Sequence, residues 1–475
     1  MREALKRLTG ESLIYGLGQV SGRAVQFLLV PILTRVLTRD VYGVADLVLA
    51  YSQFVVLVLV FGMDGALVRF FYQEPDRESR RRMVSTSLWF RLAVSLGVSA
   101  LLALLARTLA PSLIGSAAYR KYLLIGALTL PFTLLSLFVN DVLRVTFQPW
   151  KFITLNLVQT LVTGLVSLWL VLNRHLGVAG VLYGKLAGDA TATLMGLVLA
   201  RKSLAPVFDR PVLARMLAFG LPVVPASFAY GIVGSADRYF LQRSRGLAEV
   251  GTYAVAVKFF AMAMMAVSAF SLAFFPFAHA RAKEPDAPRL FARVLSLYVV
   301  AASLAGLLLG AFASEVVSLL APPEYRAASR PALLLAFAAV AYGAYYVACL
   351  GIQLSLKTSL LGWTAGAAAI VSLAANAVLA PRMGGLGAAL ATLLGNVTLA
   401  IATYVVAQSV HPLPYQGGRL LFLFLFAVGL GVLAQHGAML GAWSWAAKLA
   451  AAATFVVAAW LSGALPRRMT VAIRG

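Results

Sequence analysis

The chain has 475 residues, of which 61% are hydrophobic and only 12% are charged, and this balance excludes a soluble globular protein. Its 40 lysines and arginines outnumber its 17 acidic residues and give a formal net charge of +23. No soluble, basic, aromatic-rich domain carries this charge, so nucleic acid is not an expected partner. The single cysteine, Cys349, excludes an intrachain disulfide and a cysteine metal site.

Long apolar blocks recur at intervals of roughly 30 residues, and each is long enough to cross a bilayer as a helix. They predict an all-α polytopic membrane protein, because the alternating ten-residue segments of outer-membrane barrels are absent. The loops between the blocks are too short to fold as separate domains. The fourteen predicted spans cover residues 12–36, 44–71, 83–109, 120–145, 151–173, 177–200, 213–236, 249–278, 290–313, 328–354, 358–380, 384–409, 419–436 and 443–464.

The first predicted span, 12–36, carries Arg23 almost at its midpoint. A guanidinium at that depth costs about 2.5–3.5 kcal/mol on insertion scales, so it needs a partner. One interpretation is an ion pair with a carboxylate on a neighbouring helix. The other, which we favour because deep cations outnumber deep carboxylates, is that Arg23 faces a water-filled cavity and binds an anion. Gly16, Gly18 and Gly22 would let a second helix or a ligand approach this face closely.

The distribution of positive charge over the loops predicts the orientation in the membrane. Loops on the side of the N-terminus receive the larger share of the lysines and arginines. Because positive loop charge accumulates on the cytoplasmic side of membrane proteins, both termini are predicted to face the cytoplasm.

The sequence repeats itself at an offset of 207 residues: residues 177–191 match residues 384–398, and Asp189 aligns with Asn396. Composition alone can make glycine-rich spans resemble one another, but here polar residues align at the same offset as the glycines. Six spans per repeat predict two parallel six-helix lobes with the site between them.

The repeat predicts three parts of the chain. These are an N-terminal lobe (1–205), a C-terminal lobe (206–412) and two additional transmembrane helices (413–475). The two additional helices are either a simple addition to the second lobe or a lipid-facing wall for a long-chain substrate.

Several basic residues lie inside predicted spans or near their ends. Arg69 is close to the cytoplasmic end of its span, so it either reaches the membrane interface or joins the site. Arg91 and Lys258 each lie about two turns inside a span, which favours a place on the wall of a polar cavity. We predict a substrate-binding set that consists of Arg23, Arg69, Arg91, Lys185 and Lys258.

The acidic residues at depth have more than one interpretation. Lys185 and Asp189 lie one helical turn apart and can pair within one helix, so a structural role is as well supported as a functional one. Asp237 and Arg238 end the seventh span, where they form a local pair or part of an outer gate. Asp141 has a similar position at the inner end of the fourth span. The predicted gating or ion-coupling residues are Asp141, Asp189, Asp237 and Arg238.

The deep groups carry an excess of positive charge, so a cavity that they share would select anions. Arginine suits phosphate because its planar guanidinium donates two hydrogen bonds to adjacent oxygens, and the inferred ligand therefore bears phosphate. The segment LYGKL at Lys185 lacks the first glycine and the serine or threonine of a phosphate loop. Because no catalytic constellation, metal cluster or ATP motif is evident, we expect neither enzyme activity nor a cofactor.

Four segments carry a family resemblance: GLGQVSGRAVQFLLVPILTRVLTRDVYGVADL, FGMDGALVRFF, FGLPVVPASFAYGIVGSADRYFL and EVGTYAVAVKFF. They resemble the polysaccharide flippases of the multidrug/oligosaccharidyl-lipid/polysaccharide exporter superfamily, both Wzx-like and lipid II flippase-like. The resemblance implies a MATE-like fold, with two six-helix lobes around a basic central cavity, in the bacterial cytoplasmic (inner) membrane. On this resemblance Arg23, Arg69 and Lys258 match basic positions of spans 1, 2 and 8.

The resemblance implies a flippase that moves an undecaprenyl-pyrophosphate-linked oligosaccharide or glycan precursor, of the kind used for O-antigen, from the inner to the outer leaflet. We expect alternating access coupled to the membrane potential, Na⁺ or H⁺, with membrane lipids and other glycan assembly proteins as partners. One alternative is a cation-coupled drug/organic-cation antiporter of the same superfamily, which needs unpaired carboxylates in its cavity. The other is an integral-membrane glycan polymerase or ligase, which needs an extended extracytoplasmic loop.

Overall fold

The structure, a computed structural model, describes residues 27, 29–282, 284–355, 357, 359–436 and 444–464. Helices are the only regular secondary structure in this part of the chain, and twelve helical segments within it are long and apolar enough to cross a membrane. The predicted span 177–200 is helix α7 (Val178–Ala200), which is not among the twelve because Lys185, Asp189 and four glycines lower its hydropathy. The predicted all-α fold is confirmed. The greater part of the predicted first span, 12–36, lies outside the described residues, and so does its Arg23.

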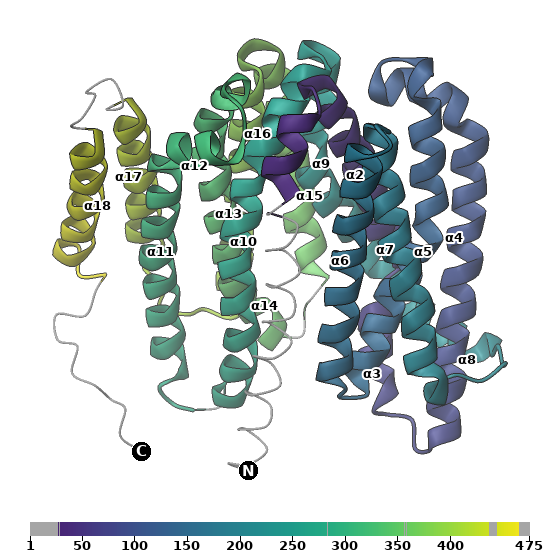
Figure 1. The fold of residues 1–475 in the computed structure, drawn as a ribbon. Coiled ribbons are helices and arrows are strands. Elements are labelled where there is room, and N and C mark those ends of the chain that lie inside the picture. Colours follow the sequence, from purple (N-terminus) through teal and green to yellow (C-terminus); the bar gives the residue numbers. More distant parts are fainter. Residues whose placement is uncertain are drawn as a thin grey trace. The chain divides into compact units, whose positions relative to one another are not determined.

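The chain divides into two compact units, and the first comprises residues up to Ala254 together with 376–384. Its core includes the completely buried side chains of Leu67, Phe138 and Met216. Besides α7, its helices are α2 (Arg39–Leu59), α3 (Met63–Phe71), α4 (Arg77–Ile114), α5 (Arg120–Val145), α6 (Pro149–Leu172), α8 (Arg210–Gly220), α9 (Val224–Arg245) and the first turns of α10 (Leu247–Arg281), as Figure 1 labels them.

Two spans of the first unit are broken at glycines. The predicted single span 44–71 consists of α2 and α3, which meet at Phe61 and Gly62, both with positive φ (51° and 63°). A short 3-10 turn, Leu221–Val223, likewise separates α8 from α9. A Cβ on Gly220 would lie 2.1 Å from the carbonyl oxygen of Phe61. Because glycine alone permits this approach, α3 packs on α8 while α2 packs on α9.

Helices α6 and α7 form a hairpin that is closely packed along a glycine face of α7. A Cβ on Gly184 would lie 1.9 Å from Ser167 Oγ, and a Cβ on Gly188 would lie 1.9 Å from Thr163 Oγ1. The glycines therefore bring the two backbones together, as small residues do in membrane helix pairs. This packing fixes the backbone of α7 from which its polar side chains project.

The second unit comprises Val255–Ala375 and the residues from Gly385 onward. Helices α17 and α18 both pack on α11, and Lys448 of α18 forms an ion pair with Glu315 of α12. Besides the rest of α10, its helices are α11 (Ala287–Ala311), α12 (Ala313–Leu320), α13 (Ser329–Ala348), α14 (Leu350–Leu354), most of α15 (Leu360–Met383), α16 (Gly385–Val410), α17 (Gly417–His436) and α18 (Ser444–Leu461).

Each unit pairs the fourth span of the predicted repeat with the sixth, because α5 packs on α7 in the first unit and α13 packs on α16 in the second. The compact units do not follow the repeat boundaries, since α8 and α9 pack on α3 and α2 in the first unit. The division into 1–205, 206–412 and 413–475 describes a sequence repeat and stays a prediction.

Candidate functional site

Arg69 is exposed in the last turn of α3 and is held by aromatic rings. Its guanidinium carbon lies 4.8 Å from the ring centroid of Phe219 in α8 and 5.8 Å from that of Phe70. Within the described residues it has neither a hydrogen bond nor an ion pair. The aromatic rings attract the guanidinium charge but accept none of its N–H groups as a carboxylate would, so these donors remain available to an acceptor. This arrangement suits a phosphate.

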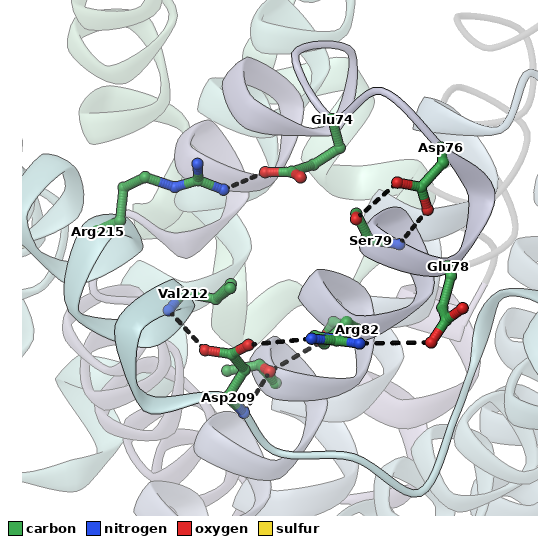
Figure 2. Close-up of polar contacts among 9 residues, drawn as sticks. Glu74, Asp76, Glu78, Ser79, Arg82, Asp209, Val212 and Arg215 are labelled. Atoms are coloured by element: carbon green, nitrogen blue, oxygen red, sulfur yellow. Dashed lines mark hydrogen bonds and ion pairs between the residues drawn. The ribbon is translucent and has the colours of Figure 1, made fainter.

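Two other arginines close to α8 are occupied by carboxylates, as Figure 2 shows. Arg215 of α8 pairs with Glu74, which lies in the loop between α3 and α4. Arg82 of α4 lies 3.9 Å from a carboxylate oxygen of Asp209, the residue that caps the N-terminus of α8. These contacts tie α4 and the preceding loop to α8, so we assign them a structural role that Arg69 does not share.

The structure joins Lys185 and Asp189 in an ion pair within α7. Asp189 is fully buried and also accepts hydrogen bonds from Gln159 Nε2, at 2.8 Å, and from the hydroxyl of Thr133. Lys185 stays 32% exposed and lines a cavity of about 30 Å³. Sequence reasoning missed Thr133 and Gln159, because they project from α5 and α6 and no spacing in the sequence links them to Asp189.

Arg91 of α4 has no exposed surface and donates a hydrogen bond to Asp141 Oδ2 at 3.0 Å. Arg144 donates to the other oxygen of the same carboxylate, also at 3.0 Å. The Arg91 guanidinium carbon lies 5.6 Å from the ring centroid of Phe138. The structure therefore encloses Arg91 between α4 and α5, whereas the sequence predicted a position on the wall of a polar cavity.

Asp237 and Arg238 belong to a buried network that joins α9 to α2 and α10. Arg238 Nε donates to Asp46 at 2.9 Å, and its Nη1 donates to Asp237 at 3.0 Å. The hydroxyl of Tyr253 donates to the second oxygen of Asp237 at 2.8 Å. Two carboxylates of the described residues contact the Arg238 guanidinium, so this arginine is not available to an anion. Asp46 was missed, because 192 residues separate it from Arg238.

The predicted shared chamber depends most on Lys258 and Arg23. Lys258 is half-buried in the part of α10 that belongs to the second unit. Arg23 lies outside the described residues. Their convergence on one wet chamber stays a prediction.

Local pairing neutralises most of the deep charge in the described part of the first unit. Arg91 has Asp141 and Lys185 has Asp189, so neither cation is available to a ligand without giving up its carboxylate. Of the predicted substrate-binding residues described in this unit, Arg69 is the one without an acidic partner.

The second unit contains an apolar cavity of about 280 Å³. Leu295 of α11 and Val340 of α13 line it together with Tyr404 of α16 and Phe424 of α17. The cavity suits a hydrocarbon group, because its walls are almost entirely apolar side chains. The contribution of α17 accords with the interpretation of the C-terminal helices as a wall for a long-chain substrate.

Twelve helical segments of the described residues are long and apolar enough to span a membrane, which defines a multi-pass membrane protein as the class. The chain belongs to a family described as "Polysaccharide biosynthesis protein", whose family model matches residues 32–330. A comparison with curated proteins found no match.

Solved structures of transporters share the fold of this chain. The lipid II flippase MurJ, in an inward closed conformation, aligns with a TM-score of 0.68 at 12% identity over 95% of this chain and 99% of its own. A mutant of the MATE transporter VcmN from Vibrio cholerae gives a TM-score of 0.61 at 15% identity over 85% and 96%. A MOP superfamily transporter from Pyrococcus furiosus gives 0.61 at 15% over 85% and 94%. The MATE-like fold and the resemblance to polysaccharide flippases are thereby confirmed.

Proposed function

We propose that this protein is a flippase that moves a polyprenyl-pyrophosphate-linked glycan precursor from the inner to the outer leaflet of the cytoplasmic membrane by alternating access. Membership of a polysaccharide biosynthesis family supports a glycan as the substrate. A fold shared with a lipid II flippase over nearly the whole chain supports a lipid-linked form of that glycan. The same likeness supports a transporter and not an enzyme.

The observation that carries the proposal is the environment of Arg69. The centroids of two aromatic rings lie 4.8 Å and 5.8 Å from its guanidinium carbon, and no acid of the described residues pairs with it. A pyrophosphate presents oxygens at the spacing that a guanidinium can bind with two parallel hydrogen bonds. Hydrogen bonds to charged groups are worth about 1.5–3 kcal/mol each, so one such contact is a substantial part of the affinity.

The apolar cavity of the second unit supports a ligand that also carries hydrocarbon. Burial of a methylene group contributes about 0.8 kcal/mol, so a few prenyl carbons in a cavity of about 280 Å³ would add usefully to binding. We expect the remainder of the polyprenyl chain to stay in the surrounding lipid.

The energy source that we propose is the membrane potential. Movement of one elementary charge through 100 mV is worth about 2.3 kcal/mol, and an outside-positive potential draws an anionic headgroup outward. Coupling to Na⁺ or H⁺ through Asp141 or Asp189 is the alternative that the sequence suggests.

A drug or organic-cation antiporter is the second candidate, and the network around Arg238 favours it. Two carboxylates, Asp46 and Asp237, lie beside this arginine, and MATE transporters share the fold. The side chains of Asp46 and Asp237 are only 14% and 3% exposed, however, and both oppose the same guanidinium. A cationic ligand would have to displace Arg238, so we prefer the flippase.

Translocation of a labelled polyprenyl-pyrophosphate glycan between the leaflets of proteoliposomes tests the role of Arg69. We expect Arg69→Ala to slow translocation about tenfold or more, because it removes a charge-assisted contact. Arg69→Lys should be intermediate, since an ammonium keeps the charge but not the two parallel donors. Arg107→Ala, which removes one exposed charge elsewhere on the first unit, is the matched control.

Two results would contradict the assignment. Wild-type rates in Arg69→Ala would remove this residue from the site. Equal losses of translocation rate in Arg69→Ala and Arg107→Ala would show that the rate depends on net charge and not on the Arg69 guanidinium.

A further inference from the structure

The charged cluster around Asp189 occurs in the first repeat and not at the matching positions of the second. Helix α16 nevertheless packs on α13 as α7 packs on α5. Asn396 of α16 is 2% exposed and donates a hydrogen bond to the carbonyl oxygen of Thr392 at 2.8 Å. A helix at this place therefore packs without charge. At the offset of 207 residues, Thr133, Gln159, Lys185 and Asp189 correspond to Val340, Gly366, Thr392 and Asn396.

Asp189 keeps a hydrogen bond on each carboxylate oxygen even without Lys185. Gln159 donates to Oδ1 at 2.8 Å, and Lys185 donates to Oδ2. The Thr133 hydroxyl is the second donor to Oδ2 when its single proton is directed there and not to the carbonyl oxygen of Thr129, 3.1 Å away. An unsatisfied buried polar atom is the costly situation in a protein interior. Departure of the Lys185 ammonium does not create one, but it leaves the buried charge of Asp189 uncompensated, and the new contact of Lys185 with a phosphate has to offset that cost.

Lys185, by contrast, has room to move. Its side chain is 32% exposed and shares the wall of the cavity of about 30 Å³ with Ser52, Gln53 and Thr129. A volume of this size has room for about one water molecule. The four-carbon stem of lysine lets the ammonium swing while the backbone of α7 stays fixed against α6.

In the part of the chain that the structure describes, no other charged group pairs with Lys185 or Asp189. Helices α5 and α6 face Asp189 with the neutral Thr133 and Gln159, and α2 faces the cavity with the neutral Ser52 and Gln53. The charged residues of these three helices, none of which forms an ion pair with Lys185 or Asp189 in the described residues, are Arg39, Asp40, Asp46, Arg120, Lys121, Asp141, Arg144 and Lys151.

We propose that the Lys185 ammonium is exchanged between two anions: Asp189 when the site is empty and a phosphate of the substrate when it is loaded. The exchange rests on the proposed function, because it takes the pyrophosphate headgroup as the second anion. Lys185 is then a substrate-binding residue and Asp189 a positioning residue that competes with the substrate. Asp189 lowers the affinity for the headgroup and recovers the ammonium when the headgroup leaves.

Binding of undecaprenyl pyrophosphate to the purified full-length protein tests the exchange, with undecaprenol as the uncharged control lipid. Lys185→Met should weaken binding about tenfold or more, because a charged donor is lost. Asp189→Asn should strengthen it about three- to tenfold, because the competing carboxylate is gone. Lys185→Thr/Asp189→Asn recreates the residues of α16 and should bind like Lys185→Met.

The two single variants are expected to change the affinity in opposite directions, and this distinguishes the exchange from a purely structural ion pair. If the pair were only structural, both single variants would bind less well. Weaker or unchanged binding by Asp189→Asn would overturn the proposal. So would a failure of Asp189→Asn to fold while the double variant folds, because an unpaired Lys185 would then not be tolerated. If the wild type binds undecaprenyl pyrophosphate no better than undecaprenol, the proposed function fails, and the exchange fails with it.

Discussion

Lys448 has only 1% of its side chain exposed, although it carries a charge in α18. Its ammonium pairs with Glu315 and lies 5.0 Å from the ring centroid of Phe312. Partial burial acts to raise the pKa of Glu315, but hydrogen bonds from Lys448 and Ser314 outweigh it, and the pKa falls below the ordinary value of 4.5. The pair therefore attaches the last described helix to α12 most strongly when Glu315 is ionised.

Acid should weaken this attachment. Because the pKa of Glu315 is lower in the folded than in the unfolded protein, its contribution to stability is complete above 4.5 and is lost as pH falls through the folded value. We expect Glu315→Gln to lower the free energy of unfolding by about 1 kcal/mol at pH 7 and to flatten its pH dependence.

Thermal unfolding of the detergent-solubilised protein at pH 7 and pH 4 measures this effect. The double variant Glu315→Leu/Lys448→Met, which leaves no charge unpaired, should lie near the wild type at pH 7. A steeper loss in acid for Glu315→Gln than for the wild type would contradict the assignment.

Ion pairs of this kind could be predicted from the sequence only where the partners are local. Lys185 and Asp189 lie one helical turn apart, so their contact was foreseeable. Arg91 is 50 residues from Asp141, and nothing in the sequence selected that carboxylate as its partner. The sequence therefore predicted too many unpaired cations inside the spans, because a cation such as Arg91 could not be matched to a carboxylate that is distant in the sequence.

The broken spans are the main feature of the helices that hydropathy could not predict. The apolar pattern is continuous through residues 44–71, because hydropathy averages over a window longer than the break. The local signals are the pairs Phe61–Gly62 and Phe219–Gly220, followed in the second case by Pro222. These pairs indicate a helix break only in combination with the contact between Gly62 and Gly220, and the sequence does not reveal that contact.

Loss of this contact should be measurable. Gly220→Ala would place a Cβ 2.1 Å from the carbonyl oxygen of Phe61, so the α2–α3 and α8–α9 breaks would have to separate. We expect a loss of about 1–3 kcal/mol in the free energy of unfolding. Gly234→Ala in α9, where a Cβ meets nothing within 4 Å, is the matched control and should be neutral or stabilising by up to about 1 kcal/mol. Equal melting temperatures for the two variants would show that the breaks are not closely packed.

At the scale of the whole molecule, composition and hydropathy were sufficient to predict the fold class and nearly every span, because membrane helices must bury all their backbone polar groups internally. They could not predict how the two repeats differ. In the described residues the first unit carries the polar cluster around Asp189, whereas the matching positions of the second are uncharged and its large cavity is apolar. This difference accords with a substrate that has both a phosphate group and a hydrocarbon chain.

We propose that the protein moves a lipid-linked anion and not an organic cation. The most direct measurement places the purified wild type in proteoliposomes under an imposed potential and follows two labelled compounds in parallel, a polyprenyl-pyrophosphate glycan and ethidium. We predict transfer of the glycan lipid between leaflets, accelerated when the destination side is positive, with ethidium uptake no faster than in protein-free vesicles. Ethidium uptake without transfer of the glycan lipid would show that the protein is a cation transporter and not a flippase.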